Sequence, residues 1–377
     1  MHTTRSTSTS SMQRTVLSYL LCGLTLCLIL SGCQVPGFTN NNSTNNNTPT
    51  VPAPTPTPAV SASLKSQGTM ELQTMQQWIN TMKQYGGQVD SYQQQYNSDQ
   101  QALQNAHSAS TYQVALDTTR NHVNDLKLAA IKQEQQTTQQ QLRQMVSSWE
   151  NSHPHHDSFN NKTYKMGFEY DDNTGIGTWI KDDRSTAKTF SDYQQIVENT
   201  NMYITNLKAM MDNANDKTPY NQPHQTDLKL LQTYNKADRL ALVVSLSEQT
   251  MRVYDHSKLI KTLLVTTGQP DKPTPPGSWW VESHQTHVTF KSIAPKGNPF
   301  WFPDTPINFA MQYHSDGYYI HDSWWRAEYG PNTQFPHQDT TGDTGADVGS
   351  HGCVNLSKSD AQWVYDHVQL FTGVIIY

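Results

Sequence analysis

The spacing of hydrophobic positions changes along the chain, and each change predicts a different kind of element. Between residues 66 and 150, apolar side chains recur at helical spacing in a Gln-rich background, which is typical of helices that bury one face. Gly86-Gly87 and the segment 105–110 interrupt this pattern. We therefore expect three helices here, the third of them long, and a further helix from Ser191, packed as an antiparallel bundle.

Two local signals refine this helical region. Ser110, with Gln113 three positions later, resembles a capping box for the third helix. Farther on, aromatic or apolar residues alternate with other residues from Tyr164 to Tyr170, and a turn sequence follows at 171–175. This alternation predicts a small β-hairpin.

Three histidines and an aspartate stand close together at His153, His155, His156 and Asp157. These residue types bind metal ions, but they lack the helical or paired-strand spacing that aims ligands at one ion. A solvated loop is the favoured interpretation. We therefore predict no metal site here.

From residue 237 onward the hydrophobic period becomes that of strands. Leu240 begins an alternation of apolar residues that continues to Leu246, and similar short runs recur between turn residues, which indicates mainly-β structure. One late helix is expected from Ser359, and the apolar run 373–377 is expected to be a strand.

These changes divide the chain into an N-terminal α-helical bundle region and a C-terminal mainly-β domain, preceded by a leader and a linker. The linker is rich in Asn, Thr and Pro, a composition that favours an extended spacer over a packed core. The predicted boundaries are 1–32 for the leader, 33–65 for the linker, 66–236 for the helical region and 237–377 for the mainly-β domain.

The leader combines export and anchoring signals. Residues 16–30 form an apolar run of the length found in secretory signals, whereas a bilayer span takes about 20 residues. The run ends Leu30-Ser31-Gly32-Cys33, which resembles the bacterial lipobox. We therefore expect an extracytoplasmic protein, lipid-anchored to the bacterial membrane through Cys33. An uncleaved membrane helix with an incidental cysteine is the alternative.

Charge and cysteine content exclude two classes of protein. The chain has 26 Lys and Arg against 32 Asp and Glu, which provides no basic surface for phosphates, so no nucleic acid partner is expected. Its four cysteines are Cys22, Cys27, Cys33 and Cys353. Three of them fall in the leader or at its end, so the protein is not a disulfide scaffold.

Cys353 therefore stands alone, and an unpaired thiol in an exported protein suggests a function. Gly352 permits a sharp turn that aims the amides of Gly352 and Cys353 at one point, where an oxyanion would form. The thiol also needs a base. His351 lies two residues away, whereas His321 ends a predicted strand and shares one face of it with Tyr319. We favour His321 as the base.

Residues 350–355 read Ser-His-Gly-Cys-Val-Asn and fit the Ser/Thr-His-Gly-Cys-x-Asn signature of the L,D-transpeptidase catalytic domain, the YkuD-like family of cell-wall enzymes. Gly268 and the Pro-Thr-Pro-Pro-Gly sequence at 273–277 resemble a second element of the same family. The resemblance covers residues 237–377 and does not extend to the helical region.

This resemblance implies a β-sandwich fold, no cofactor and peptidoglycan stem peptides as substrates. Cys353 would be the nucleophile and His321 the general base. The backbone carbonyl of residue 322 would orient the imidazole, leaving the Asp322 side chain free to vary. The oxyanion and substrate site would comprise Ser350, His351, Gly352, Asn355, Tyr319, Trp325 and Arg326.

The implied activity is cross-linking of stem peptides through a cysteine thioester, with acylation by carbapenems. One departure is that 28 residues (322–349) separate His321 from Ser350, more than is usual in the family, and we expect a longer lid over the cleft. The alternatives are an L,D-carboxypeptidase or thiol peptidase acting on the same stems, and a non-catalytic wall-binding lipoprotein. Papain-like enzymes place the cysteine before the histidine, and the opposite order of His321 and Cys353 argues against them.

Overall fold

The computed structural model of the chain describes residues 59–377. The predicted leader, Cys33 and most of the linker lie outside the described residues. Between residues 59 and 377, every helix is too short or too polar to cross a bilayer. The helices are α1 (Ala62–Gln84), α2 (Asp90–Asn105), α3 (Ala109–Ser152), α4 (Ile176–Thr186), α5 (Phe190–Ala214), α6 (Gln225–Thr233) and α7 (Lys358–His367), with a short 3-10 helix η1 (Phe168–Tyr170).

Within residues 59–377, the strands form three sheets. A small one pairs β1 with β2, a four-stranded one has the order β10-β9-β8-β7, and a five-stranded one has the order β5-β4-β3-β11-β6. Their bounds are β1 (Pro154–Asp157), β2 (Lys162–Lys165), β3 (Leu240–Ser245), β4 (Thr250–Asp255), β5 (Lys258–Leu264), β6 (Gly277–Trp280), β7 (Ser283–Phe290), β8 (Thr305–His314), β9 (Tyr318–Asp322), β10 (Val354–Leu356) and β11 (Gly373–Ile376).

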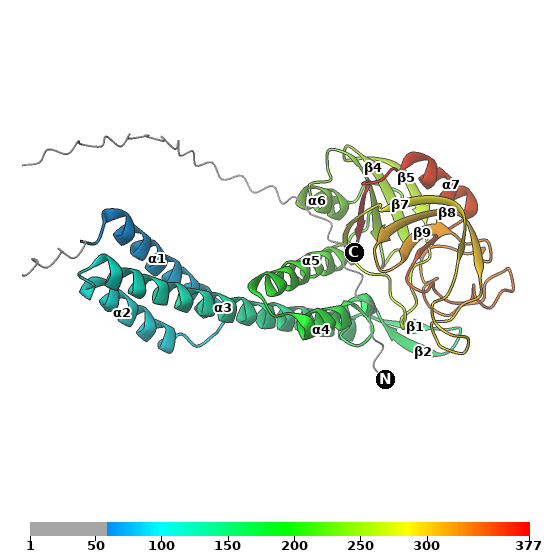
Figure 1. The fold of residues 1–377 in the computed structure, drawn as a ribbon. Helices are drawn as coiled ribbons and strands as arrows, with labels where there is room; N and C mark the ends of the chain where they lie inside the picture. Colours follow the sequence, from blue (N-terminus) through cyan, green and yellow to red (C-terminus); the bar gives the residue numbers. More distant parts are fainter. Residues whose placement is uncertain (1–58) are drawn as a thin grey trace, which may run out of the picture. The chain divides into compact units, whose positions relative to one another are not determined.

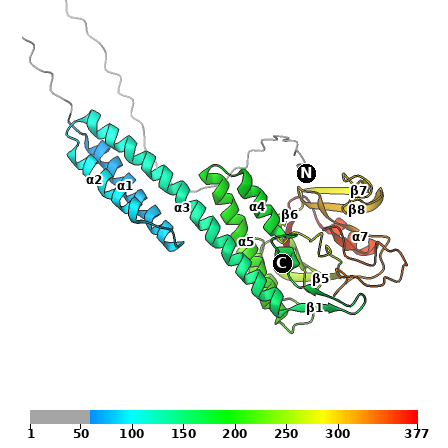
Figure 2. The same cartoon turned by 90° about the horizontal axis from the view of Figure 1, so that it is seen from below.

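The long helix α3 connects the parts of the helical region (Figures 1 and 2). Its first part packs Val123, Leu126 and Ala130 against α1, and its last part packs Leu142 and Val146 against α5. The expected three helices over 66–150, the third of them long, are therefore present.

The predicted cap of α3 was wrong by two residues. The hydroxyl of Ser108 accepts from the amide of Thr111, and the hydroxyl of Thr111 accepts from the amide of Ser108, both at 3.2 Å. This reciprocal pair is the capping box. Because the helix begins at Ala109, Ser110 and Gln113 lie inside its first turns.

The predicted hairpin was also misplaced. The strands that pair are β1 and β2, with His155 opposite Tyr164, so the turn precedes Tyr164 instead of following Tyr170. The chain then forms η1 and enters α4 at Ile176. The histidines around position 155, expected on a solvated loop, therefore lie at the end of α3 and in β1.

The two larger sheets face each other across one buried core. Leu242 and Val374 of the five-stranded sheet meet Met311 and Ile320 of the four-stranded sheet. The helix α7 lies beside β8 and β9 (Figure 1). The predicted combination of an N-terminal helical region with a C-terminal mainly-β region is thus confirmed.

The strand β3 is buried on both faces, which explains its nearly continuous apolar sequence. Leu242 and Val244 point into the core between the sheets. The intervening Ala241 and Val243 belong to a second core, shared with α3, α5 and α6. The helical region therefore covers the outer face of the five-stranded sheet.

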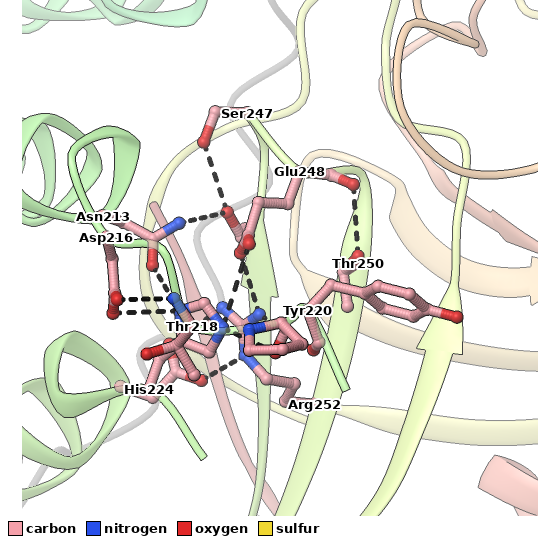
Figure 3. A network of polar contacts seen from close by, with 12 residues as sticks. Asn213, Asp216, Thr218, Tyr220, His224, Ser247, Glu248, Thr250 and Arg252 are labelled. Atoms are coloured by element: carbon pink, nitrogen blue, oxygen red, sulfur yellow. Dashed lines mark hydrogen bonds and ion pairs between the residues drawn. The ribbon is translucent and has the colours of Figure 1, made fainter. Parts of the chain in front are cut away.

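A buried polar network also joins the helical region to this sheet (Figure 3). The fully buried guanidinium of Arg252, on β4, donates to both carboxylate oxygens of Asp227 on α6 and, over 2.8 Å, to Glu248. Nearby, His224 Nδ1 lies 2.8 Å from the side-chain oxygen of Asn213 on α5. Breaking a buried ion pair of this kind costs about 3–5 kcal/mol, so the network holds α5 and α6 firmly on the sheet.

Candidate active site

Two parallel strands bring the candidate catalytic residues together. β10 pairs with β9 so that Asn355 lies opposite His321. Ile320 and Val354 point into the core between the sheets. Because neighbouring residues of a strand face opposite ways, His321 and Asn355 face away from that core. Cys353 precedes β10 by one residue and lies on the same side as Asn355.

Cys353 and His321 both line one cleft of about 440 Å³. The structure therefore brings the predicted nucleophile and the predicted base to a single cavity. Five other predicted site residues line the same cleft, namely Trp325, Arg326, Ser350, His351 and Asn355.

Tyr319 does not line the cleft itself. Its ring packs against that of Phe290, which lines the cleft, with centroids 4.7 Å apart. Its hydroxyl donates to the side chain of Gln312 over 3.3 Å. Tyr319 therefore supports the cleft wall through Phe290.

The ring of His321 is held at both nitrogens. Nδ1 lies 2.8 Å from the backbone oxygen of Asp322, which can only accept, so Nδ1 carries the proton. Nε2 then accepts from the side-chain amide of Asn355 over 3.1 Å. Burial lowers the pKa of His321 to about 4, and the Asp322 carbonyl opposes that shift. At neutral pH the imidazole is therefore uncharged, and Nε2 is its basic atom.

The side chain of Asp322 is not free to vary, contrary to expectation. It is completely buried, and its carboxylate accepts from the backbone amides of Asn308 and Phe309 and from the Asn308 side chain, over 2.7 to 2.8 Å. A carboxylate with three donors is a strong anchor. Asp322 thus fixes β8 against the end of β9, directly after His321.

Cys353 is half-buried and has a free thiol. Burial raises its pKa to about 11, and a backbone hydrogen bond from Tyr319 acts in the opposite direction. At rest the cleft therefore holds a neutral thiol and a neutral imidazole. Such a pair becomes nucleophilic when the thiol proton moves to the base during attack.

The turn before Cys353 is held by Ser350. Its hydroxyl donates to the carbonyl of Cys353 and accepts from the amide of Gly352 over 3.0 Å. The predicted use of the Gly352 amide for an oxyanion does not fit this arrangement, because that amide is already occupied. Among residues 59–377, the amide of Cys353 has no acceptor, so it is the better candidate donor.

Gly352 is required by the backbone. Its φ is +106°, and a Cβ there would lie 2.5 Å from Cε1 of Tyr318. Its carbonyl accepts from the hydroxyl of Thr274, which in turn accepts from the amide of Gly268, both over 2.8 Å. The role of Thr274 in bracing the turn was not predicted, although its Pro-Thr-Pro sequence was noted.

The 28 residues between His321 and Ser350 pass along the cleft, as a lid would. Arg326 is buried and donates to the carbonyls of Ala346 and Val348, each over 2.9 Å. Asp339 accepts from the amides of Ala327 and Glu328. Arg326 therefore uses two of its donors on the lid, whereas its buried Nε has no hydrogen-bond partner within residues 59–377. Its side chain also lines the cleft.

The β1–β2 hairpin of the helical region holds this lid. The lid residue Phe335 is 1% exposed, and its ring stacks on His155 with centroids 4.2 Å apart. Tyr164 and Phe168 complete the aromatic cluster. This contact has no local signal in the sequence, because its partners lie far apart along the chain.

The neighbouring histidines pack against aromatic rings. His153 stacks on Trp149, and His155 is engaged by Phe335. Within residues 59–377, no group of three or more His, Cys, Asp or Glu side chains is arranged to hold a metal ion.

Comparison with known proteins identifies the C-terminal region. Residues 239–376 match the family described as the L,D-transpeptidase catalytic domain, YkuD. The resemblance predicted from the signature at 350–355 is therefore confirmed for this part of the chain.

The curated relatives are L,D-transpeptidases. The chain is 29% identical to L,D-transpeptidase 1 of Mycobacterium tuberculosis over 143 residues, which cover 37% of this chain and 51% of that protein. It is 30% identical to L,D-transpeptidase 2 of the same species over 123 residues, covering 32% and 26%. The chain thus spans about half the length of the first relative, and less of the second.

Among solved structures, the catalytic domain of the E. faecium L,D-transpeptidase shares 28% identity. The match covers 37% of this chain and 98% of that one, with a TM-score of 0.30.

Proposed function

We propose that the protein is a peptidoglycan L,D-transpeptidase that cross-links stem peptides through a thioester on Cys353. The observation that carries this proposal is the single cleft that holds both the Cys353 thiol and His321, with Nε2 of the imidazole kept as a proton acceptor. A neutral base with an accepting nitrogen in the same cavity is the arrangement that thiol acyl transfer requires.

The first half of the reaction acylates the enzyme. The Cys353 sulfur attacks the carbonyl carbon of the third stem residue in a tetrapeptide donor, while the hydrogen bond from Asn355 to Nε2 of His321 opens and the thiol proton passes to that nitrogen. The Cys353 amide stabilises the oxyanion that forms. The C–N bond to the terminal D-Ala then breaks, and the imidazolium returns the proton to the leaving amine.

The second half transfers the acyl group. The amine of a second stem attacks the thioester carbonyl, and His321 accepts a proton from it. The C–S bond breaks, and the Cys353 sulfur recovers a proton from His321. The product is an amide between two stems, and the resting neutral pair is restored.

We further propose that the protein acts outside the cytoplasm, anchored to the membrane by lipid on Cys33. The Asn-, Thr- and Pro-rich segment that follows Cys33 would then act as a spacer. Labelling with a radioactive fatty acid tests this proposal. Label on the wild type and none on Cys33→Ala is expected, whereas equal label on both would exclude it.

Analysis of products tests the activity. Incubation of the protein with tetrapeptide stems should release D-Ala and form stem dimers. Monomeric tripeptide with D-Ala but without dimers would identify an L,D-carboxypeptidase. Binding without any D-Ala release would identify a non-catalytic wall protein.

A further inference from the structure

The helical region has a cavity of its own, which we call the α1–α2 groove. It measures about 730 Å³ and is lined mainly by the first half of α1 and by α2, with contributions from the residues just before α1 and from the start of α3. It shares no lining residue with the catalytic cleft. Its volume lies within the range of about 300–1,000 Å³ that is typical of small-molecule sites.

The most buried side chains of the groove are apolar or aromatic. Leu103 is 5% exposed and Tyr112 is 6% exposed, and Leu72 packs against the cluster that they form. Tyr96, which is half-buried, adds a second aromatic ring. Tyrosine rings provide a rigid apolar surface with a polar hydroxyl at one end. The groove therefore offers a ligand two flat apolar surfaces.

Gly68 makes room for one of these rings. A Cβ at position 68 would lie 2.3 Å from the hydroxyl oxygen of Tyr112. That hydroxyl donates to the carbonyl of Lys65, also on α1, over 3.4 Å. A glycine inside a helix costs about 1 kcal/mol relative to alanine. The helix therefore gives up some intrinsic stability at Gly68, and the tyrosine hydroxyl is accommodated against α1.

The polar side chains of the groove are mostly amides. Gln73, Gln100 and Gln104 line it, and within residues 59–377 none of these three side chains is bonded to another residue. A primary amide offers both hydrogen-bond donors and an acceptor. The three glutamines are therefore free to bond a ligand in either sense.

The groove carries little charge. Besides its tyrosines, the ionisable residues that line it are Lys65 and His107, and both are exposed to water. In the described part of the chain, no carboxylate lines the groove. A cationic ligand would thus find no counter-charge, and an anionic ligand would find a well-solvated ammonium that contributes little. The lining fits an uncharged polar ligand best.

We propose that the α1–α2 groove binds an uncharged sugar chain that carries N-acetyl groups. The apolar C–H faces of the sugar rings lie on Tyr96 and Tyr112, and the hydroxyl groups bond the glutamine amides. An N-acetyl group is itself an amide with one donor and one acceptor, so one glutamine side chain can match it with two hydrogen bonds. This binding is separate from the acyl transfer proposed above, because it uses no residue of the catalytic cleft.

Titration calorimetry on the full chain tests the proposal. The probe is chitotetraose, a linear tetramer of N-acetylglucosamine. The comparison ligand is cellotetraose, the glucose tetramer of the same linkage, which has hydroxyl groups where chitotetraose has N-acetyl groups. The variants are Tyr96→Ala, Gln100→Ala and Thr69→Trp, the last of which fills the groove from an exposed position.

Two of these variants have matched controls outside the groove. Gln101→Ala repeats the change of Gln100→Ala on the exposed neighbour in α2. Thr118→Trp mirrors Thr69→Trp, because both threonines are exposed and donate to the carbonyl four residues earlier. Thermal unfolding checks that each variant is folded, and Thr69→Trp keeps the test valid if Tyr96→Ala destabilises the bundle.

We expect the wild type to bind chitotetraose at least about fivefold more tightly than cellotetraose, because cellotetraose lacks the amide. Tyr96→Ala and Thr69→Trp should each raise the Kd for chitotetraose about 10-fold or more. Gln100→Ala should raise it about three- to fivefold. Gln101→Ala and Thr118→Trp should match the wild type.

A wild type that does not bind chitotetraose would overturn this inference, as would a Kd that both Thr69→Trp and Tyr96→Ala leave unchanged. Equal affinity for the two tetrasaccharides would overturn it too, because the amides would then recognise nothing. A wild type that binds chitotetraose through the groove but forms no stem dimers would support this inference and contradict only the transpeptidase activity proposed above.

Discussion

The side-chain amide of Asn355 donates to Nε2 of His321 over 3.1 Å. The donor stands opposite its acceptor in the β9–β10 register, so this bond is set by strand pairing. It holds the basic nitrogen of the imidazole on the cleft side of the sheet. In the resting protein, His321 is thus oriented through Asn355 and through the Asp322 carbonyl.

Asn355→Ala should slow acylation of Cys353 by imipenem about 10- to 100-fold, because a ring free to rotate loses its alignment with the thiol. The measurement is the rate of adduct formation under single-turnover conditions. Asn201→Ala, on the exposed face of α5, is the control and should react at the wild-type rate. An Asn355→Ala variant as fast as this control would show that the bond does not position the base.

Asp322→Ala should destabilise the protein by about 2–4 kcal/mol, because it leaves three buried donors of Asn308 and Phe309 without an acceptor. Urea unfolding measures this free energy. The control is Asp304→Ala, which removes a well-exposed side chain just before β8. It should change the free energy of unfolding by less than about 0.5 kcal/mol. Equal stability of the two variants would contradict the role given to the Asp322 side chain.

Phe335→Ala should release the lid from the hairpin of the helical region. Because Phe335 stacks on His155, each single substitution should speed proteolytic cleavage within 327–347. The double variant Phe335→Ala/His155→Ala should add little to either one. His156→Ala, on the exposed neighbour of His155, is the control. If the effects of Phe335→Ala and His155→Ala on the cleavage rate simply add in the double variant, this result would argue against a contact between the two side chains.

Glu169 and His321 should make stability depend on pH in opposite directions. Burial raises the pKa of Glu169 from 4.5 to about 8, so its contribution is present below pH 4.5 and is lost as pH rises toward 8. Burial lowers the pKa of His321 from 6.5 to about 4, so its contribution is present above pH 6.5 and is lost as pH falls toward 4.

Glu169→Gln should therefore gain stability relative to the wild type between pH 5 and pH 8, by roughly 3 kcal/mol. Urea unfolding of both proteins at the two pH values measures the difference. The control Glu198→Gln, on the exposed face of α5, should track the wild type across the range. A difference between Glu169→Gln and the wild type that is the same at both pH values would contradict the raised pKa of Glu169.

The sequence predicted the parts of the site that are local. Residues 350–355 form a single turn leading into a strand, so the contacts of Ser350 with Gly352 and Cys353 depend on neighbours in the chain. The alternation that ends at His321 likewise placed this residue on one face of β9. Both features follow from short-range geometry and a specific signature.

The features of the fold and the site that the sequence did not predict depend on contacts between residues far apart along the chain. Ala241 and Val243 of β3 gave no sign that α5 and α6 would cover them. A strand buried on one face alternates between apolar and polar residues, and burial on both faces removes this alternation. The β1–β2 hairpin turns at Asn160-Asn161, where Asn161 has a φ of +56°. This Asn-Asn pair was a local turn signal, but the alternation after Tyr164 led us to place the turn later in the chain. The Phe335–His155 stack likewise has no signal in the local sequence pattern.

We propose Cys353 as the nucleophile and His321 as the residue that activates it. Intact-mass measurement of the full chain after incubation with imipenem tests both roles. The wild type should gain the mass of one imipenem, His321→Gln should gain it at least about 100-fold more slowly, and Cys353→Ala should gain none. An adduct that forms equally on Cys353→Ala would contradict the account.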